Sequence, residues 1–271
     1  MADKALVKVE RKALEVGDAV LGLVTMNRPE ELNPLDWDTV RELDRVFGEL
    51  ASDPAVRVVA VTGAGRAFSA GGYMKKYQQL QRHPTDFPQF LADIHAMFLR
   101  IGEYPKPYVA LMNGVSVAGG TELMLSCDLA MAGESARIGD AHLPFGQMGG
   151  GGVLTMLPRA IGPARARELI FTGRLLEPAE ALDWGLVSKV VPDAGLIDAG
   201  LAFAREVAKK SPLAVANAKR VLNAALSEGT GVPAAMRLER EVTARYCLTS
   251  DDAHEGLEAF AQKRKPRFTG R

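Results

Sequence analysis

Two glycine loops and a nearby glutamate are the residues of this chain whose types and spacing could do chemistry. The first loop, Ser69-Ala70-Gly71-Gly72, follows an apolar run, and the second, Ala118-Gly119-Gly120-Thr121-Glu122, opens a predicted helix. Glycine lets a backbone turn sharply or approach a ligand closely, and free N–H groups at a helix N-terminus favour negative charge. Two such N–H groups that converge on one oxygen would form an oxyanion hole, although ordinary turns explain the glycines as readily.

A third glycine stretch, 149–152, also precedes a predicted helix. Such a stretch could bind an anion, but it lacks the GxGxxG spacing of a dinucleotide site and the lysine of a P-loop. We therefore interpret it as a flexible connection that lets the chain pass close to a neighbour. Glu122 likewise has a simple structural explanation, because an acidic side chain in the first turn of a helix complements the helix dipole.

The composition excludes several classes of protein. Of the 271 residues, 33 are Lys or Arg and 33 are Asp or Glu. Nucleic acids and anionic membranes need a basic surplus, so we expect neither as the main partner. The two cysteines, Cys127 and Cys247, have no metal-ligand spacing and form no disulfide framework. We find no apolar window long enough to span a membrane and no signal-peptide pattern, and therefore expect a cytoplasmic protein without a metal site.

The elements that must position these loops alternate along the first two thirds of the chain. Apolar runs predict strands at 6–10, 19–26, 56–61, 108–112 and 128–132, and three-four apolar spacing predicts helices at 36–51, 87–101 and 120–126. This alternation indicates an α/β fold with mostly parallel strands. After Pro192 only helices are predicted, at 196–209, 212–227, 233–246 and 251–264. We therefore expect an α/β core over residues 1–192 and a helical oligomerisation region over residues 193–271.

Six segments, in order, resemble motifs of the enoyl-CoA hydratase/isomerase (crotonase) superfamily. They are MNRPEELNPLD, VVAVTGAGRAFSAGGYMKKY, KPYVALMNGVSVAGGTELMLSCDLAMAGESARIG, LPRAIGPARARELIFTGRLLEPAEALDWGLVSKVV, and the pair SPLAVANAKRVLNAA and DDAHEGLEAFAQKRKPRF. The resemblance implies a spiral of ββα units followed by a helical C-terminal region that builds homotrimers, often paired into homohexamers. It also implies an acyl-CoA thioester substrate, with no cofactor other than the CoA carried by that substrate.

The resemblance assigns roles to particular residues. It places the oxyanion donors at the backbone N–H groups of Gly72 and Gly119, and it matches Glu122 to the first of two catalytic glutamates. The residues it associates with CoA or substrate binding are Arg66, Ser69, Ala70, Gly72, Lys75 and Lys263. The main departure is at the second glutamate, where this chain has His142.

A histidine at that position can still transfer protons. Its ordinary pKa of about 6.5 lets it take a proton from water or substrate near neutrality and return it. Asp140 would share a face with His142 if the chain is extended there, and we include it among the substrate-binding residues. The other histidines, His83, His95 and His254, have no such support and are expected to be structural.

Three functions remain open at this point. The first is water addition, water removal or double-bond migration on an acyl-CoA, with Glu122 and His142 as acid and base. The second is hydrolytic C–C cleavage of a β-diketone or related CoA ester, in which an enolate leaves and the same oxyanion hole serves. The third is an acyl-CoA-binding subunit without catalysis, which the retained Glu122 and the titratable His142 disfavour.

Overall fold

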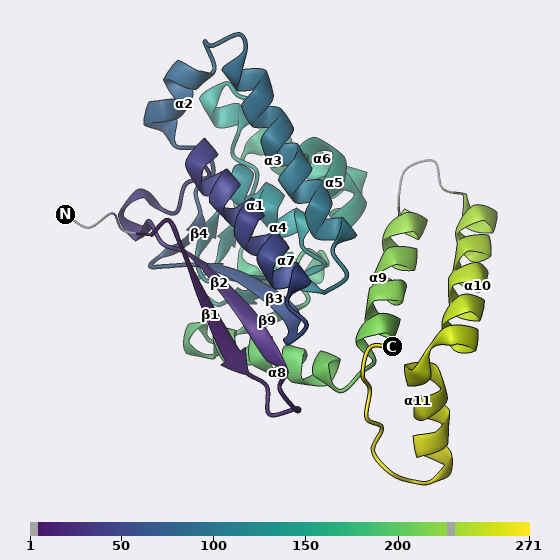
Figure 1. Cartoon of the computed structure of the whole chain (residues 1–271). Helices are drawn as coiled ribbons and strands as arrows, with labels where there is room; N and C mark the ends of the chain where they lie inside the picture. Colours follow the sequence, from purple (N-terminus) through teal and green to yellow (C-terminus); the bar gives the residue numbers. More distant parts are fainter. Residues whose placement is uncertain (1–4, 227–230) are drawn as a thin grey trace.

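The chain folds around a six-stranded sheet with the order β1-β2-β3-β5-β7-β9 (Figure 1). The structure is a computed structural model, and it describes residues 5–226 and 231–271. The strands are β1 (Val7–Ala13), β2 (Val20–Met26), β3 (Val56–Gly63), β5 (Tyr108–Met112), β7 (Leu129–Gly133) and β9 (Lys189–Val191). Only β1 and β2 pair antiparallel, and all other neighbours in this sheet are parallel. The predicted α/β fold with mostly parallel strands is confirmed.

A second, three-stranded parallel sheet runs beside the first. Its strands are β4 (Ala67–Ser69), β6 (Val115–Ser116) and β8 (Arg137–Ile138). Each follows a strand of the large sheet and precedes helices, so the chain winds through successive ββα turns, as the resemblance implied. These strands could not be predicted from the sequence, because two or three residues are too few to show an alternating pattern.

Helices cover one face of the large sheet. They are α1 (Trp37–Ser52), α2 (Met74–Leu80), α3 (Asp86–Glu103), α4 (Gly119–Ser126), α5 (Val153–Ile161), α6 (Pro163–Thr172) and α7 (Pro178–Asp183). Helix α1 begins at an Asp36 cap, whose carboxylate accepts from the Thr39 N–H at 3.1 Å, and it buries Val40, Leu43 and Phe47 in the core. Helix α4 is buried over most of its length and lies at the centre of this layer.

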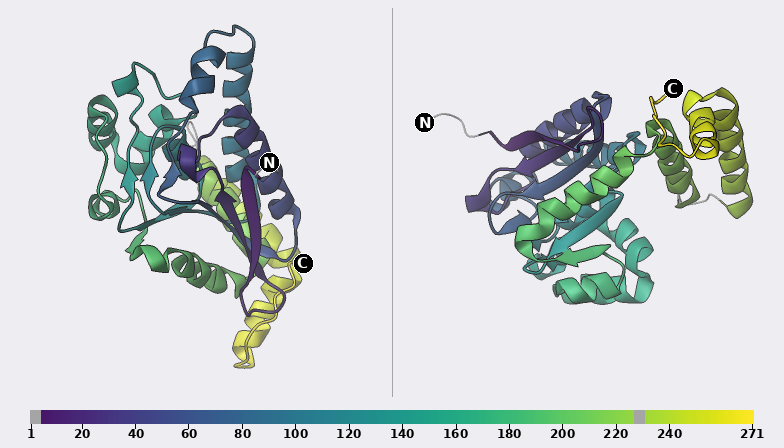
Figure 2. Two further views of the ribbon diagram at one scale, coloured as in Figure 1. Left: turned by 90° about the vertical axis from the view of Figure 1, so that its left-hand side faces the viewer. Right: turned by 90° about the horizontal axis from the view of Figure 1, so that it is seen from below.

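The opposite face of the sheet is covered by α8 (Leu196–Ala208), as Figure 2 shows. Leu196 and Ala204 join a buried cluster with Leu21 and Leu111 of the strands. Helix α8 therefore packs as part of the body, although it follows the boundary that we predicted between residues 192 and 193. The helices that stand to one side in Figures 1 and 2 begin at α9.

These outer helices are α9 (Pro212–Leu226), α10 (Val232–Thr249) and α11 (Asp251–Ala261). The predicted helix 212–227 matches α9, and residue 227 lies outside the described residues. Lys219 ties α9 to the body, because its Nζ donates to Ile101 O at 2.7 Å and to Asp128 Oδ2 at 2.7 Å. Among the described residues, no helix is long and apolar enough to cross a membrane.

Candidate active site

The second sheet brings the two glycine loops together. Strands β4 and β6 are parallel neighbours, so the loops that follow them leave from the same edge. The Val117 N–H donates to Ser69 O at 3.1 Å just beyond the strand ends. A Cβ on Gly71 would lie only 2.9 Å from Gly119 N and 2.7 Å from Ala118 Cβ, and Gly71 has φ +79°. Only glycine fits at position 71 without displacing the second loop.

The N–H groups of Gly72 and Gly119 have no partner in the part of the chain that the structure describes. Gly119 is the first residue of α4, so its N–H lies before the helical hydrogen bonds begin. The preceding residue, Ala118, has φ 50° and ψ −125°, an unfavourable conformation for a residue with a Cβ. Gly72 and Gly119 both line one cavity of about 560 Å³. Two residues with unpaired N–H groups therefore line a common space.

Glu122 lies in the wall of this cavity, one helical turn after Gly119. Its side chain is buried, and its Oε1 accepts from the N–H of Gly151 at 2.7 Å and from that of Val153 at 3.3 Å. Burial raises the pKa of Glu122, and the nearby His142 and the two N–H groups offset part of this shift. A buried carboxyl with a raised pKa is suited to accept and return a proton near neutrality.

The third glycine stretch explains how Glu122 is held. A Cβ on Gly151 would lie 2.4 Å from Oε2 of Glu122 and 2.8 Å from Phe98, so a side chain does not fit there. The close passage that we predicted for residues 149–152 is confirmed. The anion that this backbone binds is the chain's own Glu122 carboxylate.

His142 follows β8 and is paired with Asp140. Its Nδ1 lies 2.6 Å from Asp140 Oδ1, and Asp140 is fully buried. The expectation that the two side chains share a face depends on an extended chain, and the chain is not extended there, because Ala141 between them has φ 54°. The two side chains meet through this turn instead. A carboxylate on Nδ1 favours a proton on that nitrogen and leaves Nε2 for the cavity, which His142 lines.

The surroundings of His142 favour its charged form. Burial alone would lower the pKa of His142, but the hydrogen bond to Asp140 and the charges of Asp140 and Glu122 together raise it above the ordinary value. Oδ2 of Asp140 is buried and has no hydrogen-bond partner among the described residues. His142 is thus the main partner of the Asp140 carboxylate, and the hydrogen bond between them orients the imidazole ring.

Glu122 and His142 both lie beside Gly149, the first residue of the third glycine stretch. A Cβ on Gly149 would lie 3.3 Å from Oε1 of Glu122 and 3.5 Å from Cε1 of His142. The two titratable side chains therefore lie close together in one cavity, which Gly72 and Gly119 also line. This arrangement can bind an oxyanion and move a proton on either side of it.

Of the remaining residues predicted to bind substrate, some line the cavity and others do not. Ala70 and the exposed Lys75 line the cavity, whereas Arg66, Ser69, Asp140 and Lys263 do not. Ser69 is fully buried, and its Oγ accepts from the Gly71 N–H at 3.2 Å, so it supports the loop from behind. Asp140 reaches the cavity only through His142.

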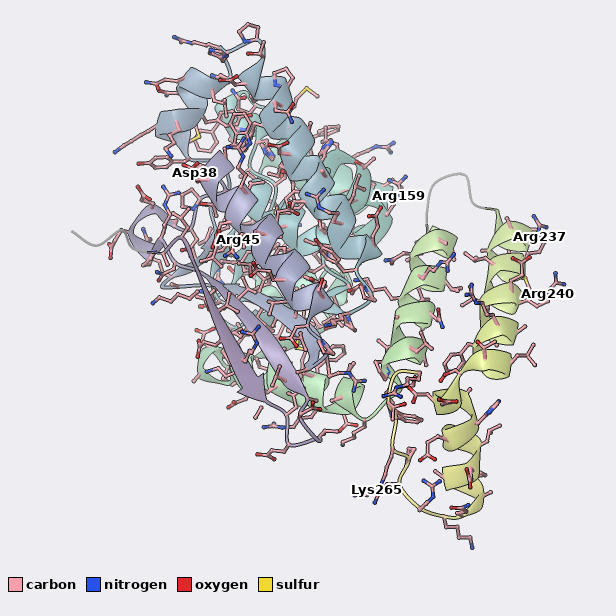
Figure 3. The ribbon with its side chains drawn as sticks, in the orientation of Figure 1. Asp38, Arg45, Arg159, Arg237, Arg240 and Lys265 are labelled. Carbon is pink, nitrogen blue, oxygen red and sulfur yellow. The ribbon has the colours of Figure 1, made fainter. Side chains whose placement is uncertain are left out.

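The two predicted cations that do not line the cavity are both exposed. Arg66 is in the turn before β4. Lys263 follows α11. Figure 3 labels Lys265, two residues further along the chain, at the bottom of the outer helices, whereas α2 lies at the top of the body in the same orientation (Figure 1). Within one chain the structure does not bring Lys263 to the site, and the substrate-binding roles of these residues stay predictions.

The polar and bulky stretch from Tyr73 to Pro88 is predicted from the sequence to shape the acyl pocket, but as a loop, and neither its helix α2 nor the site residues of α3 are predicted. Tyr77 of α2 and the α3 residues Leu91 and Ile94 line the cavity. Helix α2 has only seven residues, so it carries too little periodicity to distinguish it from a loop. The N–H groups that hold Glu122 were also missed, because they come from residues far along the chain.

Comparison with known proteins agrees with this geometry. The profile of the Enoyl-CoA hydratase/isomerase family matches residues 17–271. A probable enoyl-CoA hydratase of Mycobacterium bovis is 35% identical over 258 residues, covering 94% of this chain and 96% of that protein. A short-chain-enoyl-CoA hydratase of Clostridium acetobutylicum is 32% identical over 246 residues, covering 90% of this chain and 92% of that protein.

A solved structure is similar over nearly the same length. The crystal structure of an enoyl-CoA hydratase from Bacillus anthracis superposes with a TM-score of 0.91 at 30% sequence identity, covering 98% of this chain and 100% of that one. The matches thus include the ββα spiral, the two glycine loops and the outer helices. The chain is an enzyme of the enoyl-CoA hydratase/isomerase family, within the crotonase superfamily.

Proposed function

We propose that this enzyme adds water to the double bond of an enoyl-CoA thioester, or removes it in the reverse direction. The observation that carries the proposal is the placement of Glu122 and the Asp140-paired His142 on the cavity that holds two unpaired N–H groups. The names of the relatives, which are hydratases of enoyl-CoA, support the same reaction class.

The proposed reaction begins with the thioester oxygen between the N–H groups of Gly72 and Gly119. Glu122 takes a proton from water as the water oxygen bonds to the β-carbon, and the double-bond electrons move to form an enolate. The imidazolium of His142 then gives its proton to the α-carbon. One molecule of water has been added, and the proton on Glu122 returns to His142. Each N–H donor would lower the barrier by roughly 3–4 kcal/mol.

A second candidate is favoured by one specific observation. A histidine oriented by a buried carboxylate, as His142 is by Asp140, is also the arrangement of a general base that activates water for attack on a carbonyl. Water attack on a β-diketone would break a C–C bond, and the leaving enolate would occupy the same N–H pair. A subunit that binds acyl-CoA without catalysis remains the third candidate.

A panel of substrates distinguishes these candidates. We expect the purified enzyme, incubated with enoyl-CoA, 3-hydroxyacyl-CoA and cyclic β-diketone compounds, to convert an enoyl-CoA into a product heavier by one water molecule in mass spectrometry. A cleaved acid from the diketone would instead establish hydrolysis. An unchanged mass with a new absorption spectrum would establish double-bond migration, and no conversion in any reaction would contradict an enzymatic role for this cavity.

We also propose that the outer helices assemble the enzyme into a homotrimer or homohexamer. Large apolar side chains on these helices are exposed, and they include Leu222, Leu226, Val232, Met236, Leu248, Leu257 and Phe260. Helix α10 has no buried residue at all in the described chain. Apolar surface of this extent on helices that stand apart from the body is typical of an interface between copies.

The assembly has a direct test. We expect light scattering to give the mass of three or six chains at micromolar concentration, and Leu257→Glu together with Phe260→Glu to give a smaller species, since a buried charge destabilises an apolar interface. Gln262→Glu adds a charge to the end of α11 without removing apolar surface and is the matched control. A wild-type protein with the mass of one chain would contradict the proposal.

A further inference from the structure

We propose that Tyr77 limits the length of the acyl group by separating the apolar end of the active-site cavity from a second cavity. The inference rests on the proposed function, since it takes an acyl-CoA as the occupant. The second cavity has a volume of about 350 Å³ and lies on the other side of α2 residues that also line the first. Tyr77 would make it inaccessible to the acyl chain.

The two cavities share a wall. Four residues line both of them, namely Leu35, Tyr73, Tyr77 and Phe90. Two members of this wall lie against the glycine loops. A Cβ on Gly72 would be 3.4 Å from Tyr77 Cδ2, and a Cβ on Gly119 would be 3.3 Å from Leu35 Cδ1. A thioester carbonyl held by the Gly72 N–H would therefore lie beside the Tyr77 ring.

The polarity of the first cavity determines where the acyl chain goes. Tyr77, Phe90, Leu91 and Ile94, which come from α2 and α3, give the cavity an apolar lining. Charged residues line it as well, among them Glu30 and Lys75. An alkyl chain gains most by burial against the apolar side chains. Tyr77 and Phe90 belong to this apolar lining and also line the second cavity.

In the described part of the chain, the Tyr77 side chain is held in place by packing and not by hydrogen bonds. Its ring packs edge-on against Phe87, with 5.7 Å between the ring centroids, and its hydroxyl makes no hydrogen bond with the described residues. Burial and the charge of Glu122 raise the pKa of Tyr77, so the ring is neutral. A side chain held by packing, with no polar partner in the cavity, acts there through its volume.

The second cavity offers apolar surface to an alkyl chain on part of its wall. Six of its twelve lining residues are apolar or aromatic, among them Leu35, Trp37 and Leu80, and the other six are polar or charged. The charged Lys76 is neutralised there, since its Nζ lies 3.1 Å from both Asp36 Oδ2 and Asp38 Oδ2. Asp38 is labelled in Figure 3 near the start of α1, below α2. Opening the wall would thus extend the apolar surface available to the acyl group.

Binding of saturated acyl-CoA thioesters tests the inference without depending on turnover. In a calorimetric series from butanoyl-CoA to tetradecanoyl-CoA, we expect wild-type affinity to rise with chain length and then to level off at the wall. In Tyr77→Ala the rise should continue, by about fourfold for each further buried CH₂ group. Binding of the longest chains should become on the order of 50-fold tighter than in wild type.

Three further variants keep the test decisive. In Tyr77→Leu, affinity should keep rising with chain length beyond the wild-type limit, but less far than in Tyr77→Ala. This variant serves if Tyr77→Ala does not fold. Tyr77→Phe should keep the wild-type profile because the ring remains. Phe87→Leu is the matched control, since Phe87 packs on Tyr77 but lines neither cavity. Equal changes in Phe87→Leu and Tyr77→Leu would mean that loosening of α2 causes the effect, and would overturn the inference.

The outcomes also separate this inference from the proposed function. A wild-type protein that binds none of the thioesters would overturn both. Superimposable chain-length profiles for wild type and Tyr77→Ala would overturn only the role of Tyr77. A changed profile in Tyr77→Ala, in an enzyme that hydrates no enoyl-CoA, would support the wall and contradict hydration.

Discussion

Glu122→Gln is expected to lower kcat by roughly 10²–10⁴-fold, the usual loss on removing a general base. The amide is nearly the same size as the carboxyl, and its oxygen can still accept from the Gly151 N–H. The change removes the ability to take a proton from water while leaving the cavity shape intact. Steady-state kinetics on the substrate identified by the panel, with calorimetric Kd values for the product, would measure both effects.

The control for this variant is Glu103→Gln, at the exposed end of α3 and outside the cavity. We expect its kcat to match that of wild type, and we expect Glu122→Gln to bind product with a Kd close to the wild-type value. A Glu122→Gln enzyme with nearly normal kcat would remove Glu122 from proton transfer.

His142→Ala is expected to cause a comparable loss in kcat, with a much smaller change in substrate binding. The reason is that His142 lies beside Glu122 and next to Asp140, so its removal takes away the group that we propose protonates the α-carbon. His95→Ala is the matched control, because His95 is exposed on α3 outside the cavity. His142→Glu restores the glutamate pair typical of the superfamily, and we expect it to recover hydration of crotonyl-CoA.

The pH dependence identifies His142 independently. In the active state Glu122 is ionised and His142 is protonated, so kcat/KM should follow a bell-shaped profile. Because the pKa of His142 is raised, the rate should fall as pH rises through a value above about 6.5. Because the pKa of Glu122 is raised, the rate should fall on the acid side as pH drops through a value above about 4.5. The alkaline fall should be absent in His142→Ala, and its persistence there would assign it to another group.

The sequence predicted the parts of the site that depend on short stretches of chain. Gly72 and Gly119 follow apolar runs, and Glu122 and His142 stand at positions that the superfamily resemblance marks. The strands that bring the loops together could not be predicted, because the stability of β4, β6 and β8 comes from pairing between distant segments. A pattern within one segment carries no information about its partner.

The same limit applies to the partners of the reactive groups. The N–H of Gly151 binds Glu122 across 29 residues of chain, and nothing near either residue in the sequence indicates that contact. Tyr77 lies in the stretch 73–88 that the sequence indicates as shaping the acyl pocket, but its helix is too short for a periodic signal, so the position of its side chain could not be predicted. Asp140 does contact His142, but through a turn at Ala141, and the extended chain from which the sequence suggested a shared face is not present.

Incorporation of solvent oxygen is the most direct test of the proposed hydration. Wild-type enzyme, Glu122→Gln and His142→Ala would be incubated with crotonyl-CoA in water enriched in heavy oxygen, and the products followed by mass spectrometry. We predict that wild type forms a hydroxyacyl-CoA carrying one heavy oxygen atom from the solvent, at a rate that falls steeply in both variants. Recovery of unlabelled crotonyl-CoA or its double-bond isomer from the wild-type reaction, with no labelled product, would contradict the account.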